Sequence, residues 1–200
     1  GRFEMAEPAP PNVGTKVLEW RQRRGMSLRV LAVACDLSPN TISLIERGVS
    51  SPSVSTLHRL ATALRVPITS FFQEGIEKVE LIAGRAGQRP RTGSDRVQLE
   101  SLGSGLLDQT LEPFLVTLSP GADSGEQAIF HAGHELVYCL QGELEYTVAG
   151  QPHYLGHSDS LLFEARLPHR WRNLGVNPVV FLLIFQAEGQ SGSVQTHLSP

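Results

Sequence analysis

The chain has 200 residues, of which 40% are hydrophobic and 18% are charged, and its net charge is −3. This length favours two domains, the composition favours a folded chain over a disordered one, and the apolar runs are too short to span a membrane. Only two cysteines are present and no leader with a charged and then an apolar segment is recognisable. We therefore expect a cytoplasmic protein without disulfides.

Charge is distributed unevenly along the chain. Residues 12–72 hold eight basic and three acidic residues, a net charge of +5, so the remainder carries −8. A basic segment attracts the phosphates of nucleic acid, whereas an acidic segment repels them. The first segment is therefore the candidate for binding DNA.

Flanking helices and a hairpin are expected in the first third of the chain. A helix over residues 15–24 comes first, and two short helices joined by a tight turn follow over 27–48. Asp36 lies in this turn and tolerates the positive φ that such a turn often needs. Ser53 then caps a helix with a clear apolar stripe, and Pro67 opens a last short turn.

The second helix of the hairpin has a polar outward face. Short or basic side chains lie near its N-terminus, which is the placement from which a recognition helix reaches base edges. Arg29 lies near the N-terminus of the first helix, where we expect it to contact a phosphate. A helical hairpin used only for protein contacts is the alternative. The expected DNA contacts are Ser27, Arg29, Ser38, Asn40, Thr41, Ser43, Leu44 and Arg47.

The segment LAVACDLSPNTISLIERG resembles the helix-turn-helix of the XRE family, whose members are similar to phage repressors such as the lambda repressor. The resemblance covers about residues 12–72. In that family a buried Arg on the first helix pairs with a Glu that ends the recognition helix, and Arg21 and Glu46 stand at those positions. A Glu in the last turn of a helix opposes the helix dipole, so Glu46 is better explained by a cationic partner.

From residue 79 onward the chain shows short β-prone runs divided by Gly and Pro. Such a series of strands favours a β-sandwich or barrel. Residues 73–96 are expected to form a linker and first-strand region, in which 84–94 is an extended connection. The strands are expected over residues 79–83, 97–102, 114–118, 136–140, 144–148, 161–163 and 179–185.

Two stretches of the second half, HAGHELVYCLQG and ARLPHRWRN, carry side chains suited to a metal. Alternate residues of a strand share a face, so His131 and Glu135 share one if the turn between them keeps parity. Together with His169 they would form a triad that leaves positions open for water or a ligand. Two imidazoles and a carboxylate suit non-haem iron, zinc, manganese or nickel. Trp171 shares a face with His169 and is a further candidate for effector contact.

These stretches resemble the two motifs of the cupin family, H-x-H-x3-E-x6-G and one that ends in H-x3-N, over about residues 79–188. Ile129 replaces the first His, so at most three of the usual four ligands remain, and His134 is expected to face the other way. The resemblance implies an all-β jelly-roll barrel holding a divalent metal. A metal-free pocket whose histidines hydrogen-bond an effector is the alternative. The residues that fit the motifs are His131, Glu135, Gly142, His169 and Asn173.

A helix-turn-helix followed by a cupin resembles a class of bacterial one-component transcription regulators with an α + β, two-domain fold. The resemblance implies a homodimer that binds double-stranded operator DNA, has no membrane partner, and senses a small-molecule effector. The effector would shift the spacing of the two recognition helices by favouring one dimer arrangement. The alternative is a mononuclear iron cupin oxygenase, such as the epoxidase that makes fosfomycin, which uses the same His, Glu, His set. The complete DNA-reading surface favours a regulator over an enzyme. The expected effector contacts are His131, Glu135, His169 and Trp171.

Overall fold

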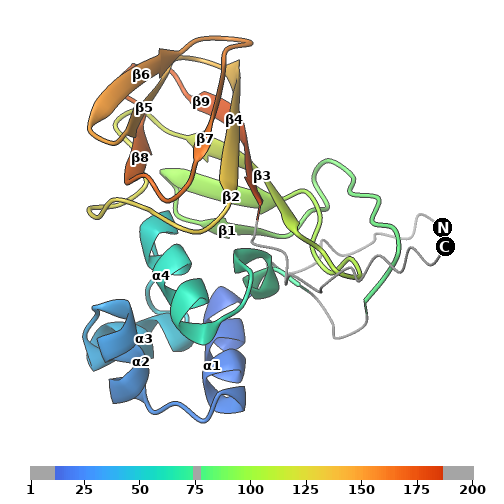
Figure 1. Cartoon of the computed structure of the whole chain (residues 1–200), viewed down its shortest axis with the longest axis vertical. Coiled ribbons are helices and arrows are strands. Elements are labelled where there is room, and N and C mark those ends of the chain that lie inside the picture. The colour runs from blue at the N-terminus through green and yellow to red at the C-terminus, as the bar shows by residue number, and fades with distance from the viewer. Residues whose placement is uncertain (1–11, 74–77, 187–200) are drawn as a thin grey trace, which may run out of the picture.

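The computed structural model describes residues 12–73 and 78–186, which form a helical domain and a β-barrel (Figure 1). No single helix in these ranges is long and apolar enough to cross a membrane. The helical elements are α1 (Val13–Arg23), α2 (Leu28–Cys35), α3 (Pro39–Glu46), α4 (Val54–Leu64) and the 3-10 helix η1 (Ile68–Phe71).

Serine N-caps begin three of the four α-helices. The hydroxyls of Ser27, Ser38 and Ser53 each accept a hydrogen bond from the backbone N–H three residues ahead, which satisfies one free N–H of the first turn. The turn between α2 and α3 bends the chain by 107°. Asp36 takes the left-handed conformation there, with φ 51°, as expected from its place in the sequence. Gly48, with φ 69°, follows the end of α3.

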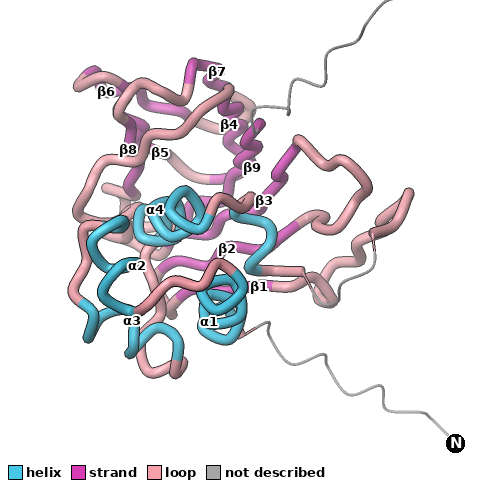
Figure 2. The backbone as a smooth tube through the Cα atoms, turned by 60° about the horizontal axis from the view of Figure 1, so that its bottom comes forward, coloured by secondary structure: helices cyan, strands magenta, loops and turns pink. Residues whose placement is uncertain are grey.

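Within residues 12–73 and 78–186, nine strands form two antiparallel sheets that face each other (Figures 1 and 2). The larger sheet has the order β1-β2-β3-β9-β4-β7 and the smaller one has the order β6-β5-β8. Together with the four helices they confirm the predicted α + β, two-domain fold. The strands are β1 (Arg91–Gly93), β2 (Val97–Ser101), β3 (Leu111–Leu118), β4 (His134–Gln141), β5 (Leu144–Val148), β6 (Gln151–Leu155), β7 (Ser160–Glu164), β8 (His169–Arg172) and β9 (Val179–Gln186).

Strands β3 and β9 alternate between a buried and a more exposed side chain, which places every second residue inside the barrel. The buried residues of β3 and β9 are apolar except Glu112, which lies at the end nearest the helical domain. The core of the barrel is therefore apolar over most of its length, with polar groups gathered at one end.

Two of the strand predictions need correction. Residues 79–83 do not form a strand, because Val79 makes only an isolated bridge to Leu106 and the chain beyond it has no ladder partner. The extended connection predicted over 84–94 contains the short strand β1. In addition, β6 and β8 are absent from the predicted list. Residues 74–77 of the predicted linker and 187–188 of the predicted cupin segment lie outside the described residues.

The two domains pack directly against each other through α4 and η1. The backbone N–H of Ser55 donates to the carbonyl oxygen of Ser124 (3.1 Å), and the rings of Phe72 and Phe114 lie 5.2 Å apart. Figure 1 shows α4 between the barrel and the α2–α3 hairpin. The helix that follows the recognition helix is therefore also the helix that contacts the barrel.

Candidate functional site

The candidate DNA-binding face lies on α2 and α3, on the side of α4 away from the barrel (Figure 1). Asn40 and Arg47 are exposed, while Thr41, Ser43 and Leu44 are half-buried. Arg47 also donates through Nε to the carbonyl oxygen of Ser43 (3.3 Å). The first turn of α3 therefore presents short polar side chains to solvent.

The remaining predicted DNA contacts are at or near helix N-termini. Arg29 is exposed in the first turn of α2. Ser27 and Ser38 are exposed, but their hydroxyls already serve as N-caps. The hydroxyl of Ser38 also lies 2.8 Å from that of Thr41. These serines fix the helix starts, which sets the direction of the free backbone N–H groups that a phosphate would meet.

Arg21 and Glu46 form a two-point ion pair between α1 and the end of α3. Arg21 Nε lies 2.6 Å from one carboxylate oxygen and Nη2 lies 2.9 Å from the other. The hydrogen bond to Glu46 raises the pKa of Arg21, and the two side chains are only 14% and 7% exposed. The pair therefore holds the recognition helix against α1, which is the arrangement that the sequence predicts.

Sequence reasoning missed Arg59, which lies on α4. Its Nη1 donates to the carbonyl oxygens of Cys35 (2.9 Å) and Asp36 (3.2 Å). These oxygens are left free at the end of α2, so Arg59 ties α4 to the helix-turn-helix turn. The sequence pattern of α4 does not indicate what a basic residue beside its apolar stripe will contact.

The second candidate site is the group His131, Glu135 and His169 inside the barrel. Their ligand atoms all lie within 4.8 Å of one another. One oxygen of Glu135 lies 3.0 Å from Nε2 of His131 and 3.2 Å from Nε2 of His169. Glu135 comes from β4, His169 from β8 and His131 from the loop before β4, so both sheets contribute to the group.

The orientation of the two imidazoles fits a metal ion. Nδ1 of His131 lies 2.9 Å from the carbonyl oxygen of Ala132, and Nδ1 of His169 lies 2.7 Å from that of Leu167. A carbonyl only accepts, so both Nδ1 atoms carry hydrogen, and both Nε2 atoms point toward the same oxygen of Glu135, where they could coordinate a metal. Nε2 of His169 is buried, and among the described residues its contact with Glu135 at 3.2 Å is not a hydrogen bond of good geometry. Two imidazoles and a carboxylate thus converge on one point.

The carboxylate at the centre of this group is ionised. Burial by itself would raise the pKa of Glu135, but the two imidazoles more than offset this and lower it to about 2. Burial also opposes protonation of His131, yet the hydrogen bond and the charge of Glu135 raise its pKa. A cation, either a proton on His131 or a metal ion, therefore compensates the buried carboxylate.

The second oxygen of Glu135 has a partner that sequence reasoning missed. The hydroxyl of Tyr146, on β5, donates to it. Burial raises the pKa of Tyr146 well above its usual value, so this hydroxyl keeps its proton. Tyr146 therefore orients the carboxylate from outside the group, and its place in an alternating strand was the only signal available.

The other candidates of the sequence analysis lie apart from the group. Trp171 is buried further along β8, with its ring edge-on to Phe181 at 5.4 Å. His134 faces outward, as its place beside Glu135 indicates, and Nδ1 lies 3.2 Å from Gln186 Oε1. Ile129 is buried and bridges to the backbone of His169.

Two family models match the chain. A helix-turn-helix model matches residues 17–71 and a cupin-domain model matches residues 114–185. The match to the first contains the whole α2–α3 hairpin, and the match to the second contains all three residues of the candidate metal group.

Curated proteins and solved structures match over most of the chain. The HTH-type transcriptional regulator PuuR of Escherichia coli is 30% identical over 80% of this chain and 86% of its own length. The HTH-type transcriptional regulator SutR of Escherichia coli is 29% identical over 84% of this chain and 91% of its own. The crystal structure of an HTH_3 family transcriptional regulator from Vibrio cholerae, 24% identical, covers 88% of this chain and 95% of that one with a TM-score of 0.67. The chain therefore belongs to the family of helix-turn-helix transcriptional regulators that carry a C-terminal cupin domain.

Proposed function

We propose that this regulator binds operator DNA as a homodimer through residues 12–72 and that residues 79–188 sense a small-molecule effector. The observation that carries the proposal is the exposed first turn of α3, which faces away from the barrel (Figure 1). A helix N-terminus that is free of other contacts can enter the major groove, whereas the opposite side of the domain is covered by the cupin.

The side chains on this face have separate roles in the proposal. The amide of Asn40 can pair with the edge of an adenine, and Arg47 can reach a guanine or a phosphate. Arg29 is placed to meet a phosphate. Base contacts give sequence specificity, whereas phosphate contacts strengthen binding to any DNA.

The first test compares alanine variants at Asn40 and Arg29 on a selected operator and on random DNA, over a series of salt concentrations. Asn40→Ala is expected to weaken operator binding by about 1 to 3 kcal/mol and to leave binding to random DNA nearly unchanged. Arg29→Ala is expected to weaken both and to lower the salt slope by about one. Arg166→Ala, at an exposed position of the barrel, is the matched control for loss of one positive charge. Equal losses on both DNAs for Asn40→Ala would contradict its role in reading bases.

The outward face of the larger sheet supports the proposal of a homodimer. It carries cross-strand rows of apolar side chains, of which Leu136 is 36% and Leu162 is 68% exposed. These two residues lie directly opposite each other on β4 and β7. Apolar rows continue over β9 and β3 through Leu182, Ile184 and Leu115. An exposed apolar face of this kind is suited to a two-fold interface.

We also propose that the His131, Glu135 and His169 group holds one divalent metal ion, of which zinc, iron, manganese and nickel are the candidates. The two Nε2 atoms that converge on one ionised carboxylate support this proposal. A bound ion would offer open coordination positions to an oxygen or nitrogen of the effector. Metal would also replace the proton that otherwise compensates Glu135.

The metal content of purified protein tests this part of the proposal. About one ion per chain is expected, and single alanine variants at each of the three positions should lose most of it. His134→Ala is the matched control, because this histidine lies outside the barrel. Metal retained by His169→Ala would contradict the proposed ligand set, and wild-type protein without metal would favour the metal-free pocket.

We propose sensing rather than catalysis, although the same donor set would serve an iron oxygenase. The intact DNA-reading face supports sensing, because an enzyme does not require it. Iron-loaded protein should return the small molecule that copurifies with it unchanged after incubation with oxygen. Its conversion to a product that depends on Glu135 would contradict the proposal.

A further inference from the structure

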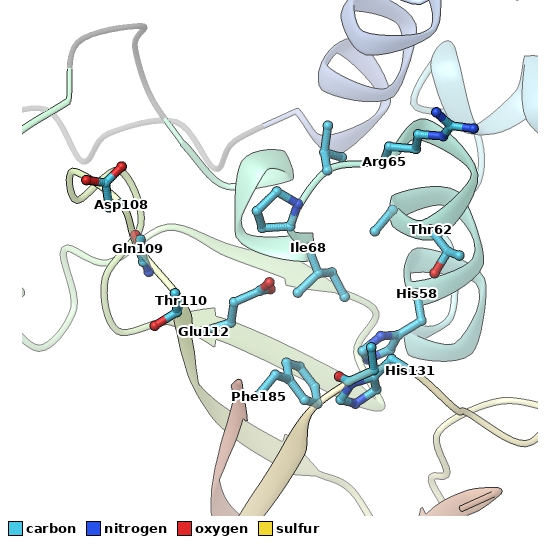
Figure 3. Close-up of a pocket in the computed structure, with 14 residues that line it drawn as sticks. His58, Thr62, Arg65, Ile68, Asp108, Gln109, Thr110, Glu112, His131 and Phe185 are labelled. Carbon is cyan, nitrogen blue, oxygen red and sulfur yellow. The ribbon is translucent and has the colours of Figure 1, made fainter. Parts of the chain in front are cut away.

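A cavity of about 650 Å³ lies between the helical domain and the barrel. One wall comes from α4 and η1, with His58, Thr62 and Ile68 (Figure 3). The other comes from the barrel, with Glu112, Phe185 and the candidate metal ligand His131. The volume suits a small molecule, and such a molecule would touch both domains at once.

His58 is a buried polar residue of this cavity without a described partner. It is 7% exposed, stacks on His131 with ring centroids 4.9 Å apart, and meets the edge of Phe185 at 4.7 Å. Its Nε2 atom has no hydrogen-bond partner among the described residues. Leaving such a buried group unpaired is unfavourable, which indicates a missing partner.

Glu112 is a second buried group of the cavity that lacks a counter-charge. It is 4% exposed, and its carboxylate accepts hydrogen bonds from backbone N–H groups of η1, among them that of Thr69 (3.2 Å). No ion pair to Glu112 occurs within residues 12–73 and 78–186. In Figure 3 its carboxylate points into the cavity, whereas the guanidinium of Arg65 points away from it and Asp108 lies at the opposite rim. A cation in the cavity would therefore compensate Glu112.

We propose that this interdomain cavity is the effector site, that it takes a small organic amine whose ammonium group pairs with Glu112, and that His58 contacts the bound molecule. The proposal rests on the sensing function proposed above and assigns its site to a place where the DNA-binding domain itself forms part of the wall. The effector then has a direct contact with the helical domain.

Arg59, which follows His58 on α4, connects the cavity to the DNA-binding face. His58 faces the cavity, and Arg59 holds the carbonyl oxygens of Cys35 and Asp36 at the turn between α2 and α3. A displacement of α4 caused by a molecule at His58 therefore moves the contact that fixes the angle of the recognition helix. This gives the two sites one shared rigid element.

Calorimetric titration of full-length protein with linear primary amines of three to six carbon atoms tests the proposal. The alcohols of the same lengths serve as uncharged controls of similar shape. At least one amine should bind at least about tenfold tighter than its alcohol, which is the value of one charge-assisted hydrogen bond in a buried site. Glu112→Gln keeps the side-chain shape and should abolish this difference, while Glu126→Gln, at an exposed position, should retain it.

Operator titration with and without the bound amine tests the role of His58. The amine should change operator affinity about 5- to 150-fold in wild-type protein, the usual range for coupled sites. His58→Phe keeps an aromatic ring on His131 and should lose most of this change while still binding operator DNA.

Three results would overturn the proposal: amines and alcohols that bind alike, an amine that binds Glu112→Gln as tightly as wild type, or an unchanged coupling in His58→Phe. Operator binding that persists in these cases would leave the proposed DNA-binding function intact. Absence of any operator would instead contradict that function.

Discussion

Glu112 shows how one residue makes stability depend on pH. Burial raises the pKa of Glu112 from 4.5 to about 7, although the N–H of Thr69 partly opposes this. Because the folded pKa lies above the unfolded one, the folded state binds more protons between these values. The stability that this group contributes is therefore fully present below about pH 4.5 and is lost as the pH rises through about 7.

Glu112→Gln removes this titration and keeps a hydrogen-bond acceptor for Thr69. The free energy of unfolding of the variant, relative to that of wild type, should rise by up to about 3 kcal/mol between pH 5 and pH 8. This is the free energy that corresponds to the change in the pKa of Glu112. Urea unfolding at the two pH values measures this difference, and Glu126→Gln provides the control at an exposed position. A stability difference that is the same at both pH values would show that Glu112 titrates normally in the fold.

The role of a single residue was predictable where it depends on the residues next to it in the sequence. The N-cap serines and Asp36 follow from the rules of helix starts and tight turns, and the structure has them as predicted. His58 and Tyr146 were missed because their roles come from residues distant in the sequence. His58 sits on the flank of an apolar helix stripe, and nothing within α4 indicates that this flank faces His131 across a domain junction.

At the scale of elements, the packing of α1 on α3 depends on Gly14. A Cβ atom at this position would overlap the carbonyl oxygen of Ile45. Alanine normally stabilises a helix relative to glycine by up to about 1 kcal/mol, so a loss of stability on substitution would show that the close contact with α3 matters. The atom in the way belongs to the backbone of α3, which cannot move aside as a flexible side chain can.

Gly14→Ala should therefore destabilise the protein by about 1 to 3 kcal/mol and weaken operator binding, because α3 must shift away from α1. Chemical unfolding and operator titration measure the two effects. Gln22→Ala, at an exposed position of the same helix, should change stability by less than about 0.5 kcal/mol. A Gly14→Ala protein as stable as wild type would show that the two helices do not need this close contact.

The strands absent from the prediction all lie at sheet edges, although β8 does alternate buried and exposed side chains. β1, β6 and β8 each end the order of their sheet. An edge strand has one neighbour and exposes more side chains, so it need not alternate apolar with polar residues. Four of the five residues of β6 are exposed, and it contains Pro152, which an edge tolerates. The central strands β3 and β9 bury alternate side chains and were predicted to within a few residues.

At the scale of the whole molecule, the sequence predicts two domains but not how they meet. The junction consists of single contacts from elements far apart in the chain, such as Ser55 with Ser124 and Phe72 with Phe114. Contacts of this kind leave no periodic signal in either segment. The structure makes α4 and η1 common to both domains, and this arrangement places a cavity, a candidate metal ligand and the helix-turn-helix turn on one continuous path.

Selection of binding sites from a random DNA pool by the full-length protein tests the central claim most directly. The enriched sequences should contain two inverted half-sites with centres about 10 base pairs apart, bound by two chains, because a dimer presents two recognition helices one turn of DNA apart. The Asn40→Ala protein should enrich these sequences far less. A pool without enrichment, or a single unrepeated site bound by one chain, would contradict a homodimeric regulator that reads DNA through α3.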